Sequence, residues 1–246
     1  MVKVLSGVIA VLTVLLIGTS FSSKKKNVHI ITCAVNVHNN EDDYCVEANL
    51  IANELGTRMR ELYTVTEERF LYEKANPRNL RNALDQVPYN CDFLVLYLGS
   101  HGGNDGGFFQ AYLTDGNYKP RGTEFKHQTI RGREIIDRVA RLNIPTLIII
   151  DTCHSGGLMR DLANLPDNIS IIAACSEKDC SYSWVITPVL LDGLNGGADF
   201  DRDRVVTIRE LQRYCYVNAP AFRDGEGLGQ EIIHFGESNR ILTRVR

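Results

Sequence analysis

The sequence lacks the features that mark several common classes of protein. It carries a formal net charge of −3 over 246 residues, and its only dense basic cluster is Lys24, Lys25 and Lys26. A protein that binds a phosphate backbone needs more positive charge than this, so the composition argues against a nucleic-acid partner. The seven cysteines include no CxxC pair, and the spacing of Cys175 and Cys180 is a poor match to metal ligands, so neither a disulfide framework nor a zinc finger is expected. Internal repeats and low-complexity tracts are also missing.

The chain is long and apolar enough to form one domain with a sizeable core, since 44% of its residues are hydrophobic. We expect that domain over residues 27–246, after a separate segment at residues 1–26. Within this segment, residues 4–22 are almost all apolar or small and have lysines on both sides. As a cleaved signal peptide the segment has a basic start and small residues near a cleavage point, and as an uncleaved anchor it is barely long enough to span. We therefore expect either a secreted, extracytoplasmic protein or one anchored to a membrane through residues 4–22.

Hydrophobic periodicity predicts alternating strands and helices, as in an α/β fold. Continuous apolar runs predict buried strands of a mostly parallel sheet, at residues 28–37, 93–99, 147–150 and 169–174. Helices are expected between them, at residues 43–62, after the N-cap Asn76 and Pro77, at residues 131–142 and 188–194, and from about Thr207.

The stretch LIIIDTCHSGG, residues 147–157, carries the clearest chemical signal. Its apolar run indicates a central strand, and Cys153 follows that strand in a polar turn with two glycines. In open α/β sheets ligands bind beyond the carboxyl ends of the strands, so this cysteine stands where a nucleophile would be useful. The alternative, a buried structural thiol, suits Cys33, Cys91 and Cys175 better because they lie within or beside apolar runs.

A second stretch has the same form, because FLVLYLGSHGG, residues 93–103, ends in a turn that carries His101. Two such strands would bring a thiol and an imidazole to the same edge of the sheet. This pair is the nucleophile and base of cysteine peptidases, in which the imidazole accepts the thiol proton and donates one to the leaving amine. His154 is the rival base, although neighbouring side chains on a turn usually diverge.

The two motifs together, a strand ending in S-H-G and a strand ending in D-T-C-H-S-G-G, resemble the caspase-fold cysteine peptidases, and most closely their metacaspase-like, prokaryotic-type members. The resemblance covers roughly residues 27–216. It implies an α/β, caspase-like three-layer sandwich, with a mostly parallel central sheet flanked by helices. It also implies a Cys153–His101 dyad and an oxyanion hole formed by the backbone N–H groups of Gly102 and Cys153.

The resemblance also implies a substrate preference. Asp151 stands where metacaspases place the acid that pairs with a substrate Arg or Lys, whereas caspases, which cut after Asp, have a neutral residue there. Tyr182-Ser183-Trp184 resembles the caspase stretch that binds an extended substrate, and Val185 follows where caspases have an arginine. Both differences favour cleavage after a basic residue, because a carboxylate in a desolvated pocket attracts a cation and repels an anion. The alternatives are that Asp151 caps the strand end and that Trp184 is a core residue.

A second pocket acid is less clearly marked. Metacaspases usually have a C-x-x-D pattern after the first strand, and Cys45-Val46-Glu47-Ala48 departs from it. Glu47 is an available substitute, but we expect it on a solvated helix face. In the same helix the expected core face is formed by apolar or small residues that recur at helical spacing, namely Val46, Leu50, Ala52, Leu55, Met59 and Leu62.

The EF-hand ligand spacing, at loop positions 1, 3, 5 and 12, is matched by Asp199, Asp201, Asp203 and Glu210. The sixth position holds Arg204 instead of the glycine that the sharp turn requires. Thr207 and Glu210 also form a capping box, which explains both residues without a metal. Calcium at these residues is therefore the one cofactor to be tested, and no other is implied.

These features together predict a cysteine endopeptidase that cleaves protein or peptide substrates after Arg or Lys. A legumain-like peptidase with a preference for Asn is the alternative among enzymes, because those proteins share the strand-end histidine and cysteine. A catalytically silent caspase-like binding module is the alternative outside enzymes.

Overall fold

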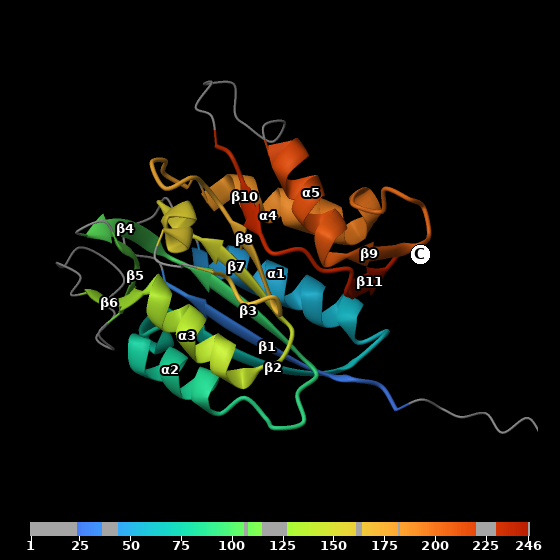
Figure 1. Ribbon diagram of the computed structural model, residues 1–246, viewed down its shortest axis with the longest axis horizontal. Coiled ribbons are helices and arrows are strands. Elements are labelled where there is room, and N and C mark those ends of the chain that lie inside the picture. The colour runs from blue at the N-terminus through green and yellow to red at the C-terminus, as the bar shows by residue number, and fades with distance from the viewer. Residues whose placement is uncertain are drawn as a thin grey trace, which may run out of the picture.

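A six-stranded sheet forms the centre of the protein, with strand order β10-β8-β7-β3-β1-β2 (Figure 1). The structure is a computed structural model that describes residues 24–35, 44–105, 108–114, 127–160, 164–181, 183–219 and 230–245. Five of the strands run parallel, and β10 at one edge is antiparallel to β8. The strands are β1 (Asn27–Ala34), β2 (Thr64–Leu71), β3 (Phe93–Gly99), β7 (Thr146–Asp151), β8 (Ile169–Ala173) and β10 (Ile233–Phe235).

Helices cover both faces of this sheet, which confirms the mostly parallel, three-layer α/β arrangement (Figure 1). Successive strand residues point to opposite faces, so Val95 and Ile149 pack into one core while Leu96 and Ile148 pack into the other. One core is closed by α1 (Tyr44–Met59), α4 (Ser183–Asp192) and α5 (Ile208–Asn218), and the other by α2 (Pro77–Asp85) and α3 (Gly132–Leu142).

Smaller elements extend this framework. An antiparallel sheet of β4 (His101–Asp105), β5 (Phe108–Thr114) and β6 (His127–Arg131) follows β3, and β9 (Val205–Thr207) pairs with β11 (Ile241–Arg244). Three short helical segments complete the described structure, namely the 3-10 helices η1 (Tyr72–Lys74) and η2 (Ser155–Met159) and the π-helical η3 (Gly193–Gly197).

Two helix starts follow the local sequence signals. The side chain of Asn76 accepts a hydrogen bond from the backbone of Asn79 at the start of α2, and Thr207 forms the expected capping box with Glu210 at the start of α5. The helix expected from Pro188 instead begins at Ser183, so this proline lies inside α4. Pro188 is the sixth residue of α4, so its missing N–H removes one backbone hydrogen bond inside the helix. The neighbouring residues Ile186, Val189 and Leu190 are buried and hold the helix against the core.

The buried face of α1 differs from the expected one. Val46 and Leu50 are 45% and 48% exposed, whereas Glu47 is only 2% exposed. Glu47 shares a stripe with Ile51 and Leu55, which are both buried, because residues four apart lie on the same side of a helix. The expectation that Glu47 is solvated was therefore wrong. Of the expected core face, Val46 and Leu50 lie on the outer side of the helix, while Ala52, Leu55 and Met59 are buried as expected.

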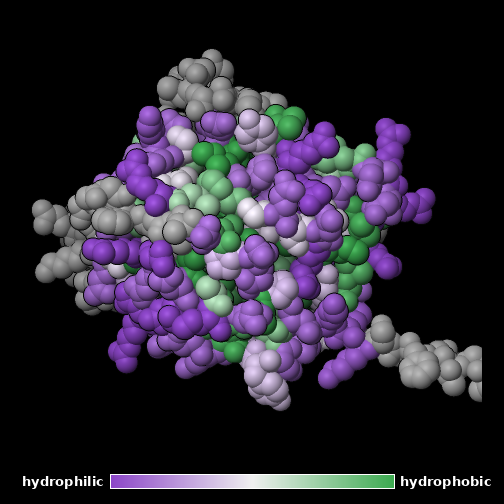
Figure 2. Space-filling view, viewed as in Figure 1, coloured by the Kyte–Doolittle hydropathy of each residue, from purple (hydrophilic) through white to green (hydrophobic). Residues whose placement is uncertain are grey.

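The described part of the chain contains no helix that is both long and apolar enough to cross a membrane. Residues 4–22, which carried the membrane prediction, lie outside the described residues. Hydrophilic side chains cover most of the molecular face in Figure 2, with apolar residues visible between them. This agrees with helices that turn their apolar sides toward the sheet.

Candidate active site

The turns that follow β3 and β7 meet at one edge of the sheet. Gly99, the last residue of β3, pairs in register with Asp151, the last residue of β7. The backbone N–H of Ser100 then donates to the carbonyl oxygen of Asp151 at 3.1 Å. One step further, Gly102 lies so close to Cys153 that a Cβ atom on the glycine would stand 2.3 Å from the carbonyl oxygen of Cys153. The turn that carries His101 is therefore in contact with the turn that carries Cys153.

Cys153 is partly exposed, and its sulfur contacts the segment that precedes α4. The backbone N–H of Ser181 donates to the Sγ of Cys153 at 3.3 Å, and the carbonyl oxygen of Ser181 lies 3.8 Å from the same sulfur. Burial raises the pKa of the Cys153 thiol to about 12, and the nearby thiols of Cys180 and Cys175 also raise it. The N–H of Ser181 acts in the opposite direction. At neutral pH the thiol is protonated, so a base must remove its proton before the sulfur can attack a carbonyl.

His101 is the first residue of β4 and is partly exposed. Its ring packs edge-on against Tyr44, the first residue of α1, with 5.8 Å between the ring centroids and 78° between the ring planes. This packing restricts the orientation of the imidazole. Its role as the base for Cys153 stays a prediction.

His154, the rival base, has a structural role in the turn. Its Nδ1 lies 2.9 Å from the carbonyl oxygen of Glu177, and its backbone N–H donates to the carbonyl oxygen of Asp179. The residue has a left-handed backbone conformation with φ of 59°. These contacts tie the Cys153 turn to the loop that follows β8, and the ring nitrogen that faces this loop is occupied by a backbone contact.

Asp151 is fully buried at the end of β7, and hydroxyl groups orient its carboxylate. The hydroxyl of Tyr97 donates to Oδ2 at 3.0 Å, and the hydroxyl of Ser181 donates to Oδ1 at 2.9 Å. Neutral donors position a carboxylate without cancelling its negative charge. Ser181 therefore contacts both Cys153, the predicted nucleophile, and Asp151, the acid predicted to bind the substrate side chain.

Glu47 lies near the same cluster, where it was not expected. The hydroxyl of Thr187 in α4 donates to Oε2 of Glu47 at 3.2 Å. Burial raises the pKa of the Tyr97 hydroxyl well above its usual value, and the charges of Asp151 and then Glu47 raise it further. Both carboxylates thus raise the pKa of the same Tyr97 hydroxyl, so Asp151 and Glu47 lie on the same side of the sheet.

Ser183 and Trp184, the predicted substrate-binding residues, form the first turn of α4 rather than an extended segment. Tyr182 lies outside the described residues. An added strand of substrate needs an extended partner, so the described backbone of Ser183 and Trp184 does not offer that pairing. Contact between these residues and a substrate stays a prediction.

The predicted calcium ligands are only partly brought together. Carboxylate oxygens of Asp199, Asp201 and Asp203 lie within 4.8 Å of one another, and within the described ranges this is the one group of three or more such side chains with metal-binding spacing. Glu210 instead accepts hydrogen bonds from the backbone N–H and the hydroxyl of Thr207, at 2.9 and 2.8 Å. Glu210, at position 12 of the EF-hand spacing, is therefore hydrogen-bonded within the capping box. Calcium binding stays a prediction.

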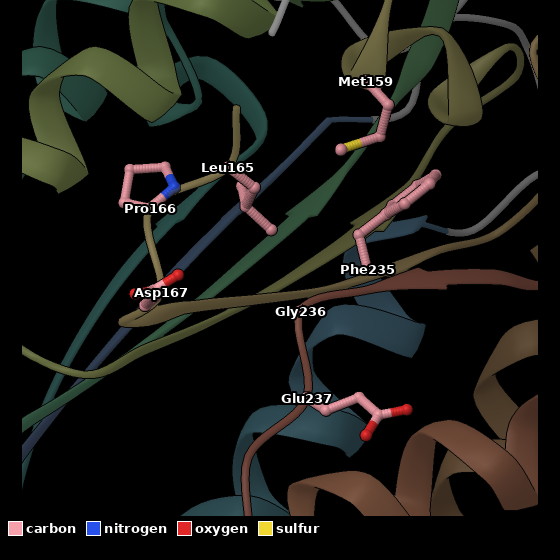
Figure 3. Close-up of a pocket in the computed structure, with 7 residues that line it drawn as sticks. All are labelled: Met159, Leu165, Pro166, Asp167, Phe235, Gly236 and Glu237. Atoms are coloured by element: carbon pink, nitrogen blue, oxygen red, sulfur yellow. The ribbon is translucent and has the colours of Figure 1, made fainter. Parts of the chain in front are cut away.

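A pocket of about 420 Å³ lies elsewhere, at the edge of the sheet formed by β8 and β10 (Figure 3). The side chain of Leu165 points toward its centre and Phe235 lines it, while Glu237 points away (Figure 3) and pairs with Arg209 at 3.1 Å. The lining is completed by Met159, Pro166, Asp167 and Gly236. The lining therefore comes from the end of η2, from the segment before β8 and from the end of β10, and it includes neither Cys153 nor His101.

Two residues of the site were missed in the sequence. Tyr97 was taken only as part of an apolar run, although it is the one residue of FLVLYLG with a polar group at its tip. Ser181 carries no local signal beyond its place next to Tyr182, because its contacts are with residues about 30 positions away.

Comparison with known proteins gives a likeness at the level of the fold. No protein-family model and no curated protein matches the chain. Among solved structures, the Drosophila initiator caspase Dronc matches with a TM-score of 0.55 at 14% sequence identity. The match covers 87% of this chain and 81% of the caspase. The protein therefore has a caspase-like fold.

Proposed function

We propose that the protein is a cysteine endopeptidase that uses Cys153 as its nucleophile and His101 as its general base. The observation that carries this proposal is the contact between Gly102 and Cys153 at the carboxyl ends of β3 and β7. This contact brings together the two turns that carry the Cys153 thiol and the His101 imidazole. They meet at the edge of the sheet where α/β folds bind their ligands. The caspase-like fold supports the same reaction class.

In the proposed reaction His101 removes the thiol proton as the sulfur of Cys153 attacks the scissile carbonyl carbon. The backbone N–H groups of Gly102 and Cys153 stabilise the oxyanion that forms. The protonated imidazole then donates its proton to the leaving amine, and a thioester remains on Cys153. Water, deprotonated by His101, attacks the thioester, which releases the carboxylic acid and restores the thiol.

We further propose that the enzyme cleaves after Arg or Lys. Asp151 lies two residues before the nucleophile and is oriented by Ser181, which also contacts the sulfur. The buried carboxylate of Glu47 adds negative charge on the same side. A desolvated carboxylate pair favours a cationic side chain strongly over a neutral or anionic one.

The test is cleavage of peptides that differ only in the residue before the scissile bond, with Arg, Lys, Asn and Asp compared. Cleavage after Arg and Lys that disappears in Cys153→Ala is the expected result. Cys91→Ala is the matched control, because this thiol is buried just before β3, at the other end of the strand from His101. Activity that survives in Cys153→Ala would disprove the assignment.

The same panel separates the two alternatives. A preference for Asn would identify a legumain-like peptidase. A silent binding module would cleave none of the peptides and would not react at Cys153 with an electrophile that carries an arginine side chain. We also propose that residues 1–26 direct the domain across or onto a membrane, which mass spectrometry of the mature N-terminus and fractionation of cells can test.

A further inference from the structure

Cys180 is a second thiol at the nucleophile. It directly precedes Ser181, whose backbone N–H and carbonyl oxygen both contact the sulfur of Cys153. These contacts hold the backbone next to Cys180 against Cys153, and the nearby Cys180 thiol raises the pKa of Cys153. Both cysteines are free.

The seven cysteines all lie in the described part of the chain, and they differ in exposure. Cys180 is exposed and Cys153 is partly exposed, while the other five are buried. Cys175, the third thiol in this region, donates to the carbonyl oxygens of Thr152 and Asp179 at 3.4 and 3.2 Å. A soluble oxidant therefore reaches Cys180 more easily than any of the buried thiols, and Cys153 is the thiol beside it.

We propose that Cys180 is an oxidation site whose product is a reversible disulfide with Cys153. Cys180 attacks a hydroperoxide, so the O–O bond breaks, an alcohol or water leaves, and Cys180 becomes a sulfenic acid. The sulfur of Cys153 then attacks the sulfur of Cys180, the S–O bond breaks, and water leaves with the thiol proton. The two thiols together supply the two electrons that reduce the hydroperoxide. A dithiol reverses the reaction by thiol–disulfide exchange.

A disulfide between Cys153 and Cys180 would block the proposed nucleophile. Formation of a disulfide requires the two Cα atoms to be within about 7 Å of each other, and the Ser181 contacts hold the neighbouring backbone against Cys153. A sulfur in a disulfide has no proton to give to His101 and cannot attack a carbonyl. This consequence rests on the proposed function, whereas the disulfide itself does not.

The experiment measures the bond directly. The full-length protein is treated with hydrogen peroxide, remaining thiols are blocked with N-ethylmaleimide under denaturing conditions, and the unreduced digest is examined by mass spectrometry. We expect one peptide pair that joins Cys153 to Cys180 and separates on reduction. Cys180→Ser and Cys153→Ser should each abolish this pair, and Cys91→Ser should keep it.

A cross-linked pair that is missing from the wild-type digest, or that joins Cys153 to another cysteine equally well in Cys180→Ser, would overturn the proposal. Peptidase activity is followed in parallel. In the wild type it should fall in proportion to the cross-linked fraction and return with dithiothreitol, and Cys180→Ser should lose less activity than the wild type in the same peroxide treatment. A cross-link in a protein that never cleaves peptides would support the redox pair and count against the peptidase.

Discussion

The backbone N–H of Ser181 donates a hydrogen bond to the Sγ of Cys153 at 3.3 Å. Hydrogen bonds to charged acceptors are stronger than those to neutral ones, so this contact favours the thiolate over the thiol. It opposes the burial that keeps the sulfur protonated. Through its hydroxyl the same serine also holds Asp151, so one residue sets the positions of the sulfur and the carboxylate.

Replacement of Ser181 by alanine tests this coupling, because the variant keeps the backbone N–H and loses only the hydroxyl. Asp151 is fully buried and would lose one of its donors. A hydrogen bond to a charged group contributes about 1.5–3 kcal/mol, so we expect the free energy of unfolding to fall by about that amount. Urea denaturation measures it.

Ser238→Ala is the matched control, since its hydroxyl accepts only a local hydrogen bond, from the backbone of Arg240 at 3.2 Å. It should cost distinctly less stability and leave peptide cleavage unchanged. Equal losses in the two variants would mean that the hydroxyl of Ser181 has no special role for Asp151.

The positions of Cys153 and Gly102 could be predicted from the sequence because their signals are local. Each residue follows an apolar run that must be a buried strand. The two strands, β3 and β7, are parallel neighbours and therefore end at the same edge of the sheet. Ser181 had no such signal. Its contacts depend on the path of the loop after β8, which only the packing of the whole domain determines.

The register of α1 shows why the second acid was misplaced. Val46 and Leu50 are four residues apart and apolar, so they were included in the core face with Ala52, Leu55 and Met59, but Tyr44, Ala48 and Ile51 occupy the interior in their place. A glutamate on that inner stripe contradicts the usual pattern of hydrophobicity. It is tolerated because the hydroxyl of Thr187, from another helix, donates to it.

Asp151→Asn should change specificity more than it changes general activity. The asparagine keeps the shape of the side chain and removes the charge that would pair with a substrate cation. Removal of one partner of a buried charge pair costs about 2–5 kcal/mol. We therefore expect kcat/KM for Arg peptides to fall by about thirtyfold or more relative to peptides with a neutral residue at that position.

Glu47→Gln is the companion variant, and it should lower the same ratio by a smaller factor. Its carboxylate comes after that of Asp151 among the charges that act on Tyr97. If Asp151→Asn slows cleavage of charged and neutral peptides equally, the carboxylate caps the strand end and does not read the substrate.

Gly102→Ala should disrupt the contact between the two catalytic turns. The added methyl group would stand 2.3 Å from the carbonyl oxygen of Cys153 and 2.8 Å from Oγ1 of Thr152. Neither turn can move away without disturbing its strand. We expect a loss of about 1–3 kcal/mol in stability, as for other overpacked sites, together with loss of peptide cleavage.

Gly157→Ala in η2, shortly after Cys153, provides the comparison. Its added methyl would stand 2.9 Å from Oδ1 of Asn104 and 3.2 Å from Cγ of Glu177, which are side-chain atoms that can shift, and it would meet no backbone atom as closely. This variant should retain most of its stability. A Gly102→Ala protein that is as stable and as active as Gly157→Ala would show that the two turns are not held as closely as described.

The reactivity of Cys153 should depend on pH in a way that differs from an ordinary cysteine. Burial raises its pKa to about 12 in the folded protein, whereas an unperturbed thiol titrates near 8.5. Only the thiolate is alkylated, so the rate with iodoacetamide should keep rising by about tenfold per pH unit above pH 9, where the rate for a small free thiol levels off. Short alkylation pulses, read by mass spectrometry of the Cys153 peptide, measure this profile.

Cys180→Ser tests one cause of the raised pKa, because the neighbouring Cys180 thiol raises the pKa of Cys153. In this variant the profile should move to lower pH. The raised pKa of Cys153 also makes the stability of the fold depend on pH. A thiol whose pKa is higher in the folded protein than in the unfolded chain contributes stability that is complete below about pH 8.5 and is lost as the pH rises toward 12. An alkylation midpoint at or below 8.5 would instead mean that Cys153 already exists as a thiolate paired with an imidazolium, and that His101 need not remove its proton during attack.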